Sequence, residues 1–383
     1  MISKVKNLNK KYNFKNYQFS LVILVIILSV FGAFMVGSAA PALFNLQLAG
    51  VVVGAVIMVI ISLIDYSWVL KFVWVLYGIN LIFLVATALF GTEVNGATRW
   101  LDLGFVQFQP SDLTKIILIL FFAKFLMVRE KAINTKGTLF FSIALMAPSA
   151  FLILRQPNLS NTITLIVVFC VMLYLAGLSY KFIGVLFAIV IPLAIVFLII
   201  AIQPNQPILR DYQQNRILAW LNPEEFADAE AYQQINSVMA IGSGQLTGKG
   251  FDNDATDSLK NSNFIAEPQN DFIFAIIGEE LGFLGGSFVI IMLLLIVLLC
   301  ILTGIRAKDL AGRIICGGLA ALIGSQTFIN IAVATHIFPN TGISLPFVSY
   351  GLTSLVCFYA GIGLVLNVGL HPHKLSGKYP NKY

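Results

Sequence analysis

The stretch "DFIFAIIGEELGFLGGSFVIIMLLLIVLLCILTG", residues 271–304, indicates what kind of protein this is. From Leu281 to Gly304 it has no charged residue, and a helix that spans a membrane needs about 20 apolar residues. Its first part nevertheless holds Asp271, Glu279 and Glu280. A carboxylate inside hydrocarbon costs roughly 2.5–3.5 kcal/mol, so these acids require partners or a function.

The composition of the whole chain agrees with a membrane protein. Of 383 residues, 58% are apolar and only 11% are charged, whereas soluble domains carry about 25% charged residues. We expect an all-α, polytopic fold that forms a single membrane domain, 1–383. Its ten predicted spans cover residues 18–38, 43–64, 68–90, 110–127, 137–154, 161–178, 182–203, 271–304, 313–335 and 347–368.

The basic residues predict the orientation. An even number of spans places both ends of the chain on one side, and most of the 24 basic residues fall at that same side. Since basic residues gather at the cytoplasmic face, the tails 1–17 and 369–383 are predicted to be cytoplasmic. The net charge of +6 thus reflects orientation in the cell membrane, and we expect no nucleic-acid partner.

The only long polar segment, residues 204–271, is predicted to be a large extracytoplasmic loop. It is acidic and carries apolar anchors, so we expect short helices on the outer surface. Its stretch "AIGSGQLTGKG", 240–250, lacks the hydroxyl residue that a phosphate-binding loop needs after its lysine, which excludes nucleotide binding. Its glycines suit either a tight turn close to substrate or membrane, or a plain flexible turn.

Three other outer segments carry polar residues: 95–115, 155–162 and 336–355. Asp112 and Lys115 share one face of a helix that begins at Pro110. They are either a simple ion pair or a site where Lys115 holds an anionic headgroup. Together with Arg99, Arg216 and the acid at 271, they predict an outward-facing cavity with cations for phosphate.

The three acids of the first stretch have separate interpretations. Asp271 is either an N-cap residue or a catalytic group at the start of a helix. Glu279 and Glu280 are consecutive and point to different faces. We expect Glu279 about 12 Å deeper in the membrane than Asp271, and both glutamates paired inside the bundle.

Six motifs along the chain resemble those of the SEDS family (shape, elongation, division and sporulation), which includes RodA, FtsW and SpoVE; RodA is the nearest in pattern. They are "NGATRW", "FQPSDLTK", "QPNLSNT", "NRILAWLNPEE", "NDFIFAIIGEELG" and "FPNTGISLPFVSYG". The resemblance implies a peptidoglycan glycosyltransferase that polymerises lipid II on the outer membrane face, for cell-wall elongation or division. It also implies a class B penicillin-binding protein as partner, with other proteins of the elongation or division complex.

The resemblance assigns roles to residues of this sequence. The essential aspartate of the family falls on Asp271, which is therefore the predicted catalytic residue. The predicted substrate-binding residues are Arg99, Asp112, Lys115, Arg216 and Glu267. The chain departs from the family pattern at Asn158, Ser160, Leu352 and Thr353, which leaves open a specialised or weakened enzyme.

The implied reaction needs a base for the acceptor hydroxyl and positive charge for the departing pyrophosphate. Asp271 is the candidate base; arginine, lysine or a divalent cation (Mg²⁺ or Mn²⁺) is the candidate for the charge. Two alternatives remain at this stage. The chain can instead be a lipid II flippase or an ion-coupled transporter, because acids inside a membrane suit proton relays. It can also be a non-catalytic scaffold of the wall-synthesis complex.

Overall fold

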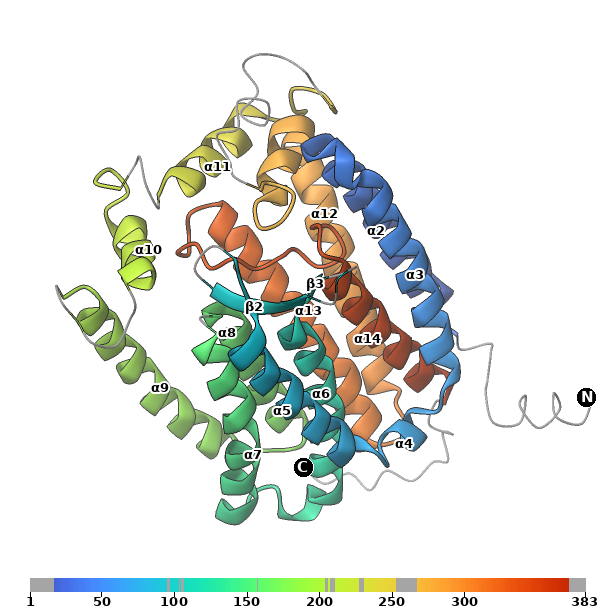
Figure 1. Cartoon of the computed structure of the whole chain (residues 1–383). Helices are drawn as coiled ribbons and strands as arrows, with labels where there is room; N and C mark the ends of the chain where they lie inside the picture. Colours follow the sequence, from blue (N-terminus) through green and yellow to red (C-terminus); the bar gives the residue numbers. More distant parts are fainter. Residues whose placement is uncertain are drawn as a thin grey trace, which may run out of the picture.

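The computed structural model describes residues 17–94, 97–102, 104, 107–156, 158–203, 206, 211–226, 231–252 and 267–371. It is a bundle of helices (Figure 1). The helices are α2 (Phe19–Ala39), α3 (Phe44–Leu63), α4 (Tyr66–Val69), α5 (Val73–Phe90), α6 (Pro110–Val128), α7 (Lys136–Arg155), α8 (Leu159–Leu175), α9 (Tyr180–Ala201), α10 (Asp211–Leu221), α11 (Tyr232–Ser243), α12 (Ile273–Ile305), α13 (Leu310–Ala334) and α14 (Leu352–Leu370), with short 3₁₀ turns at Pro41–Leu43 and Glu130–Ala132.

The all-α, multi-pass fold is confirmed. Each predicted span overlaps a long helix of this structure, although the span 68–90 also contains the end of α4 and the turn before α5. Among the described residues, seven helices are long and apolar enough to cross a membrane by length and composition. The number of ten crossings stays a prediction, as does the single domain that spans the whole chain.

Helix α13 is the centre of the bundle, because it packs against α6, α8, α12 and α14. Helix α14 in turn packs along α3, and α12 packs along α2. Helix α9 lies at the edge of the bundle in Figure 1. A polar side chain on α13 therefore has protein rather than lipid around it.

A small antiparallel sheet, absent from the sequence prediction, fills the connection between α5 and α6. Its strands are β1 (Thr92–Val94), β2 (Ala97–Asp102) and β3 (Gln107–Phe108), in the order β1-β2-β3. Strand β2 carries Arg99 and Trp100. The sheet thus gives a defined backbone to a segment that the sequence indicated only as an interfacial loop.

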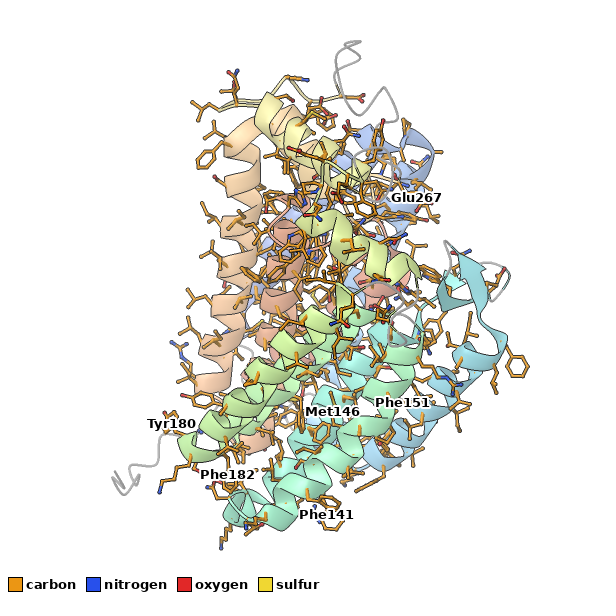
Figure 2. The ribbon with its side chains drawn as sticks, turned by 90° about the vertical axis from the view of Figure 1, so that its left-hand side faces the viewer. Phe141, Met146, Phe151, Tyr180, Phe182 and Glu267 are labelled. Carbon is orange, nitrogen blue, oxygen red and sulfur yellow. The ribbon has the colours of Figure 1, made fainter. Side chains whose placement is uncertain are left out.

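The described part of the long polar loop lies at one end of the bundle. Its two helices, α10 and α11, are the short surface helices that the sequence predicted. In Figure 2, Glu267 lies at one end of the molecule, and Phe141, Tyr180 and Phe182 lie at the other. The turns before α7 and α9 are thus opposite the loop, as the predicted topology requires; the two tails are largely outside the described residues.

The eighth predicted span is not one continuous helix. Gly282 has φ +63° and ψ −158°, which breaks α12 into an outer segment, Ile273–Leu281, and a long segment that follows Gly282. A left-handed φ is accessible to glycine without the steric cost that other residues meet. The continuous span predicted for 271–304 is therefore wrong at this point.

The glycine-rich turn after α11 supplies the hydrogen bonds that the break removes. The N–H groups of Lys249 and Gly250 donate to the carbonyls of Glu279 and Glu280, at 2.9 and 3.0 Å. In the other direction, the N–H groups of Phe283 and Leu284 donate to Gln245 and Leu246, at 2.8 and 3.1 Å. This turn is a structural clamp for the break, because backbone polar groups near a membrane need protein partners.

The break also determines where the two glutamates lie. Both are buried, and Glu279 pairs with Lys249 of the long loop at 3.1 Å. The Ser38 hydroxyl, near the end of α2, donates to the Glu280 carboxylate. The predicted pairing is confirmed, and the depth of Glu279 in the membrane stays a prediction.

We predict that Gly248→Ala destabilises the fold. Gly248 has φ +80°, and a Cβ atom there would overlap the backbone of Glu280 and Leu281. The left-handed conformation alone costs about 1–2 kcal/mol for a residue with a side chain. The melting temperature of purified protein should fall below that of wild type.

The control is Gly242→Ala, in α11, where a Cβ atom would meet open space. This change should be neutral or stabilise by about 0.5–1 kcal/mol. Equal melting temperatures for the two variants would contradict the clamp.

Candidate functional site

A cavity of about 600 Å³ opens at the end of the bundle where the long loop lies. Its lining includes five of the six residues predicted from the sequence: Arg99, Asp112, Arg216, Glu267 and Asp271. They come from β2, α6, α10 and the segment before α12. The predicted convergence of distant polar segments on one cavity is therefore confirmed by the structure.

Asp271 is the last residue of the long loop, 204–271, and lies just before α12. The N-cap position of α12 belongs to Phe272, so the interpretation of Asp271 as an N-cap residue is wrong. Its own carbonyl accepts a hydrogen bond from the Asn330 side chain at 2.8 Å. The carboxylate is one of the groups that line the cavity.

Opposing forces act on this carboxyl group. Burial raises the pKa of Asp271, while the guanidinium groups of Arg99 and Arg216 lower it and the Glu267 carboxylate raises it; the net pKa lies above the ordinary value. A carboxylate with a raised pKa binds a proton more strongly. Asp271 is thus a better base than an exposed aspartate.

The two arginines approach the carboxylate from different elements. Gly342, with φ +67°, fits between Asp271 and Arg99: a Cβ atom on it would lie 3.3 Å from Asp271 Oδ2 and 3.4 Å from Arg99 Nη1. Arg216 donates to the carbonyl of Asn340 at 3.4 Å. A cavity that holds a carboxylate together with two guanidinium groups suits a substrate that brings both a hydroxyl and phosphates.

Lys115 lies beneath the cavity wall and is 2% exposed. Its ammonium group contacts Asp112 Oδ1 at 2.8 Å, Asn161 Oδ1 at 3.0 Å and Gln326 Oε1 at 3.1 Å. These three acceptors match the three N–H donors of a lysine. The ion pair with Asp112 is confirmed, whereas a contact of Lys115 with an anionic headgroup stays a prediction that requires one acceptor to be released.

The irregular segment between α13 and α14 closes the cavity, and side chains from several helices hold its backbone. Its carbonyls accept hydrogen bonds from Gln47, Ser160, Arg216, Trp220, Gln234, Gln326 and Asn330. Phe347 in this segment is buried and has φ +65°, a conformation that is strained for a bulky residue. Such strain persists only where the surroundings fix it, and it clusters at functional sites.

The departures from the family motifs have local structural explanations. Asn158 is the N-cap residue of α8, and its side-chain oxygen accepts a hydrogen bond from the Asn161 N–H at 3.4 Å. Ser160 donates to the Thr341 carbonyl at 3.3 Å. Leu352 lines the cavity at the start of α14. Their effect on activity stays open to experiment.

Three residues of the site were missed by the sequence interpretation: Asn161, Gln326 and Asn330. Each of these side-chain amides is at least 95% buried. Asn161 and Gln326 accept hydrogen bonds from Lys115, and Asn330 donates to the Asp271 carbonyl. The signal was present, because Gln326 and Asn330 are the two amide residues of a predicted span, 313–335, that has no charged residue after Arg313. Polar residues within a membrane are expensive and mark functional positions.

Within the described ranges, no three or more His, Cys, Asp or Glu side chains gather to hold a metal ion. Besides Asp112, which pairs with Lys115, the carboxylates of Glu267 and Asp271 line the same cavity. Magnesium is often held by one or two carboxylates together with substrate phosphates. The residues present fit that kind of site and no larger one.

Comparison with known proteins agrees with this architecture. The family model described as cell cycle protein, FTSW_RODA_SPOVE, matches residues 12–374. The chain is 34% identical to peptidoglycan glycosyltransferase MrdB of Escherichia coli K12, over 93% of this chain and 94% of that protein. It is 32% identical to the probable peptidoglycan glycosyltransferase FtsW of Geobacter sulfurreducens, over 92% and 95%.

Two solved structures are similar as well. A chain of a peptidoglycan synthase complex, in which polymerisation and crosslinking are coordinated, superimposes with a TM-score of 0.76 at 27% identity, over 92% of this chain and 97% of that one. The rod shape determining protein RodA of Thermus thermophilus gives a TM-score of 0.66 at 26% identity, over 92% and 96%. The chain belongs to the FtsW/RodA/SpoVE family, the SEDS proteins.

Proposed function

We propose that this protein is a peptidoglycan glycosyltransferase that polymerises lipid II into glycan strands at the outer face of the cell membrane. The observation that carries the proposal is the carboxylate of Asp271, which lines the same cavity as Arg99 and Arg216 and whose pKa both guanidinium groups lower. Its relatives carry the name peptidoglycan glycosyltransferase over almost the whole length of the chain.

Asp271 acts as the general base in this proposal. The carboxylate takes the proton of the acceptor sugar's 4-hydroxyl, whose oxygen attacks the anomeric carbon of the donor. The bond from that carbon to the pyrophosphate oxygen breaks, and its electron pair stays on the phosphate. One displacement inverts the anomeric carbon and needs no second carboxylate as nucleophile.

Arg99 and Arg216 stabilise the negative charge that develops on the departing pyrophosphate. Both face the cavity, and both act electrostatically on the Asp271 carboxyl group. Guanidinium groups bind phosphate oxygens in pairs and keep their charge at any physiological pH. Lys115 instead stabilises the wall beneath the cavity through Asp112, Asn161 and Gln326.

A divalent cation, Mg²⁺ or Mn²⁺, is an additional candidate for the same charge. In place of its role as base, Asp271 would then hold the cation with Glu267 and phosphate oxygens of the substrate, and the cation would supply Lewis-acid stabilisation of the leaving group. Asn270 donates to Glu267 Oε2 at 2.8 Å and so orients that carboxylate.

The partner we propose is a class B penicillin-binding protein. A structural relative functions in a complex that coordinates polymerisation with crosslinking. Glycan strands need a second enzyme to crosslink them, and other proteins of the elongation or division complex would join the same assembly.

Both termini are proposed to lie in the cytoplasm, with the long loop outside. We predict that Glu225→Cys, in a cysteine-free background, reacts with a membrane-impermeant thiol reagent on intact cells. Glu225 is an exposed residue just after α10, and exposed Lys131, after α6, lies in a turn on the opposite side. The control, Lys131→Cys, should react only after lysis; the reverse pattern would refute this orientation.

We predict that Asp271→Asn lowers lipid II polymerisation by about 10²–10⁴-fold, the usual contribution of a general base. Asparagine keeps the shape of the side chain and removes the proton acceptor. The measurement is glycan polymer formed from labelled lipid II by purified protein with its penicillin-binding partner, alongside melting temperature.

Glu225→Gln, which removes an exposed carboxylate of the same loop, is the control and should keep wild-type activity. Near-wild-type polymer from Asp271→Asn would sink the base assignment. Movement of lipid II across liposomes without any polymer, by the wild-type protein, would favour the flippase instead.

A further inference from the structure

Two side-chain amides lie one helical turn apart on the outer half of α13. Gln326 is 1% exposed and Asn330 is 0% exposed. Residues four apart in a helix share one face, so both amides are directed to the same neighbours. A buried amide is costly unless it is hydrogen-bonded, which makes their partners informative.

Asn330 links two backbone segments of the site. Its Nδ2 donates to the carbonyl of Asp271 at 2.8 Å and to the carbonyl of Ile343 at 2.7 Å. Because both partners are acceptors, the orientation of the amide is fixed by its surroundings. The Asn330 side chain thus links Asp271 to the irregular segment that contains Gly342.

Gln326 makes a parallel connection one turn away. Its Nε2 donates to the Ser344 carbonyl at 3.1 Å, and its Oε1 accepts from Lys115 at 3.1 Å. Residues 343 and 344 are therefore tied to α13 at two successive positions. The two amides join Lys115, the irregular segment and Asp271 into one connected unit.

The backbone just before α12 is a turn. In it the Asn270 N–H donates to the Glu267 carbonyl at 3.1 Å, and the Gln269 carbonyl accepts from the Tyr350 N–H at 2.9 Å. Glu267 has φ +48°, an uncommon conformation for a residue with a side chain. The Asp271 carbonyl itself accepts from Asn330 on another helix, so this contact bears directly on the residue that carries the carboxylate.

We propose that Asn330 is a positioning residue, which holds the Asp271 carboxylate at its working distance from Arg99 by clamping the Asp271 and Ile343 carbonyls together. Gln326 extends the same clamp to Lys115. The proposal rests on the function proposed above, in which Asp271 is the base. Reactions of this kind are sensitive to position, since an error of 1 Å can cost about 10²-fold in rate.

The chain contains a matched control on α14. Asn367 is also 0% exposed, accepts from the Tyr66 N–H at 2.8 Å and donates to the Ser62 carbonyl at 2.8 Å. It joins backbone segments at the other end of the bundle, near the end of α14 and away from the cavity. Loss of either amide leaves buried backbone groups unpaired, so both variants should lose similar stability.

The experiment compares Asn330→Leu with Asn367→Leu in full-length protein. Asn330→Leu should raise hydrogen exchange in residues 268–275 and 338–345 about tenfold, as expected when a hydrogen bond to a buried carbonyl is lost. It should also lower kcat for lipid II by about 10²-fold, with KM little changed. Asn367→Leu should lower the melting temperature but leave both local exchange and kcat per folded molecule at wild-type values.

Asn330→Asp is the second variant, for the case in which leucine prevents folding. It keeps the shape and replaces the NH₂ group, which donates to both carbonyls, by a carboxylate oxygen that cannot donate to them, so exchange and kcat should change in the same direction. If neither variant alters local exchange or kcat more than Asn367→Leu does, the positioning role is overturned. The two proposals can fail separately. If the Asn330 variants show faster local exchange but Asp271→Asn still polymerises lipid II, the clamp is supported and the catalytic role of Asp271 is refuted.

Discussion

Every feature of the site depends on one constraint: backbone that leaves a regular helix near a membrane must find its hydrogen bonds within the protein. Two such departures in the part of the chain that the structure describes are the break at Gly282 and the segment between α13 and α14. The turn 244–250 supplies the backbone partners of the first departure. Side-chain amides such as Asn330 and Gln326 supply those of the second. The charged residues are held in place by these non-charged ones.

The same arrangement creates a chemically useful electrostatic environment. Asp271 lies outside the helix, partly removed from water, and lines the same cavity as Arg99 and Arg216. Removal from water strengthens its basicity, and in the proposed function the arginines supply positive charge for phosphate. Lys115 is arranged differently, because Asp112, Asn161 and Gln326 accept from its ammonium group. One cation supports the wall while two line the cavity.

Local sequence patterns were sufficient to predict much of this. Runs of apolar residues gave the helices, and the positions of Arg99, Asp112, Arg216 and Asp271 at the same predicted ends gave the cavity. The break at Gly282 could not be predicted, because it depends on hydrogen bonds to residues thirty or more positions earlier in the chain. For the same reason the clamp by Asn330 was missed, because it depends on partners that only the folded chain brings near. The strands of the small sheet were too short to stand out from a loop.

The most direct test of the account is the pH dependence of kcat/KM for lipid II. Only the carboxylate form of Asp271 accepts a proton, so activity should fall as pH decreases through its pKa, which burial raises above the ordinary value of about 3.9. The account predicts an acid limb clearly above that value, and the same limb in Asp252→Asn, which removes an exposed acid of the same loop. A profile that stays flat down to the ordinary carboxyl range would contradict the claim that a buried Asp271 is the base.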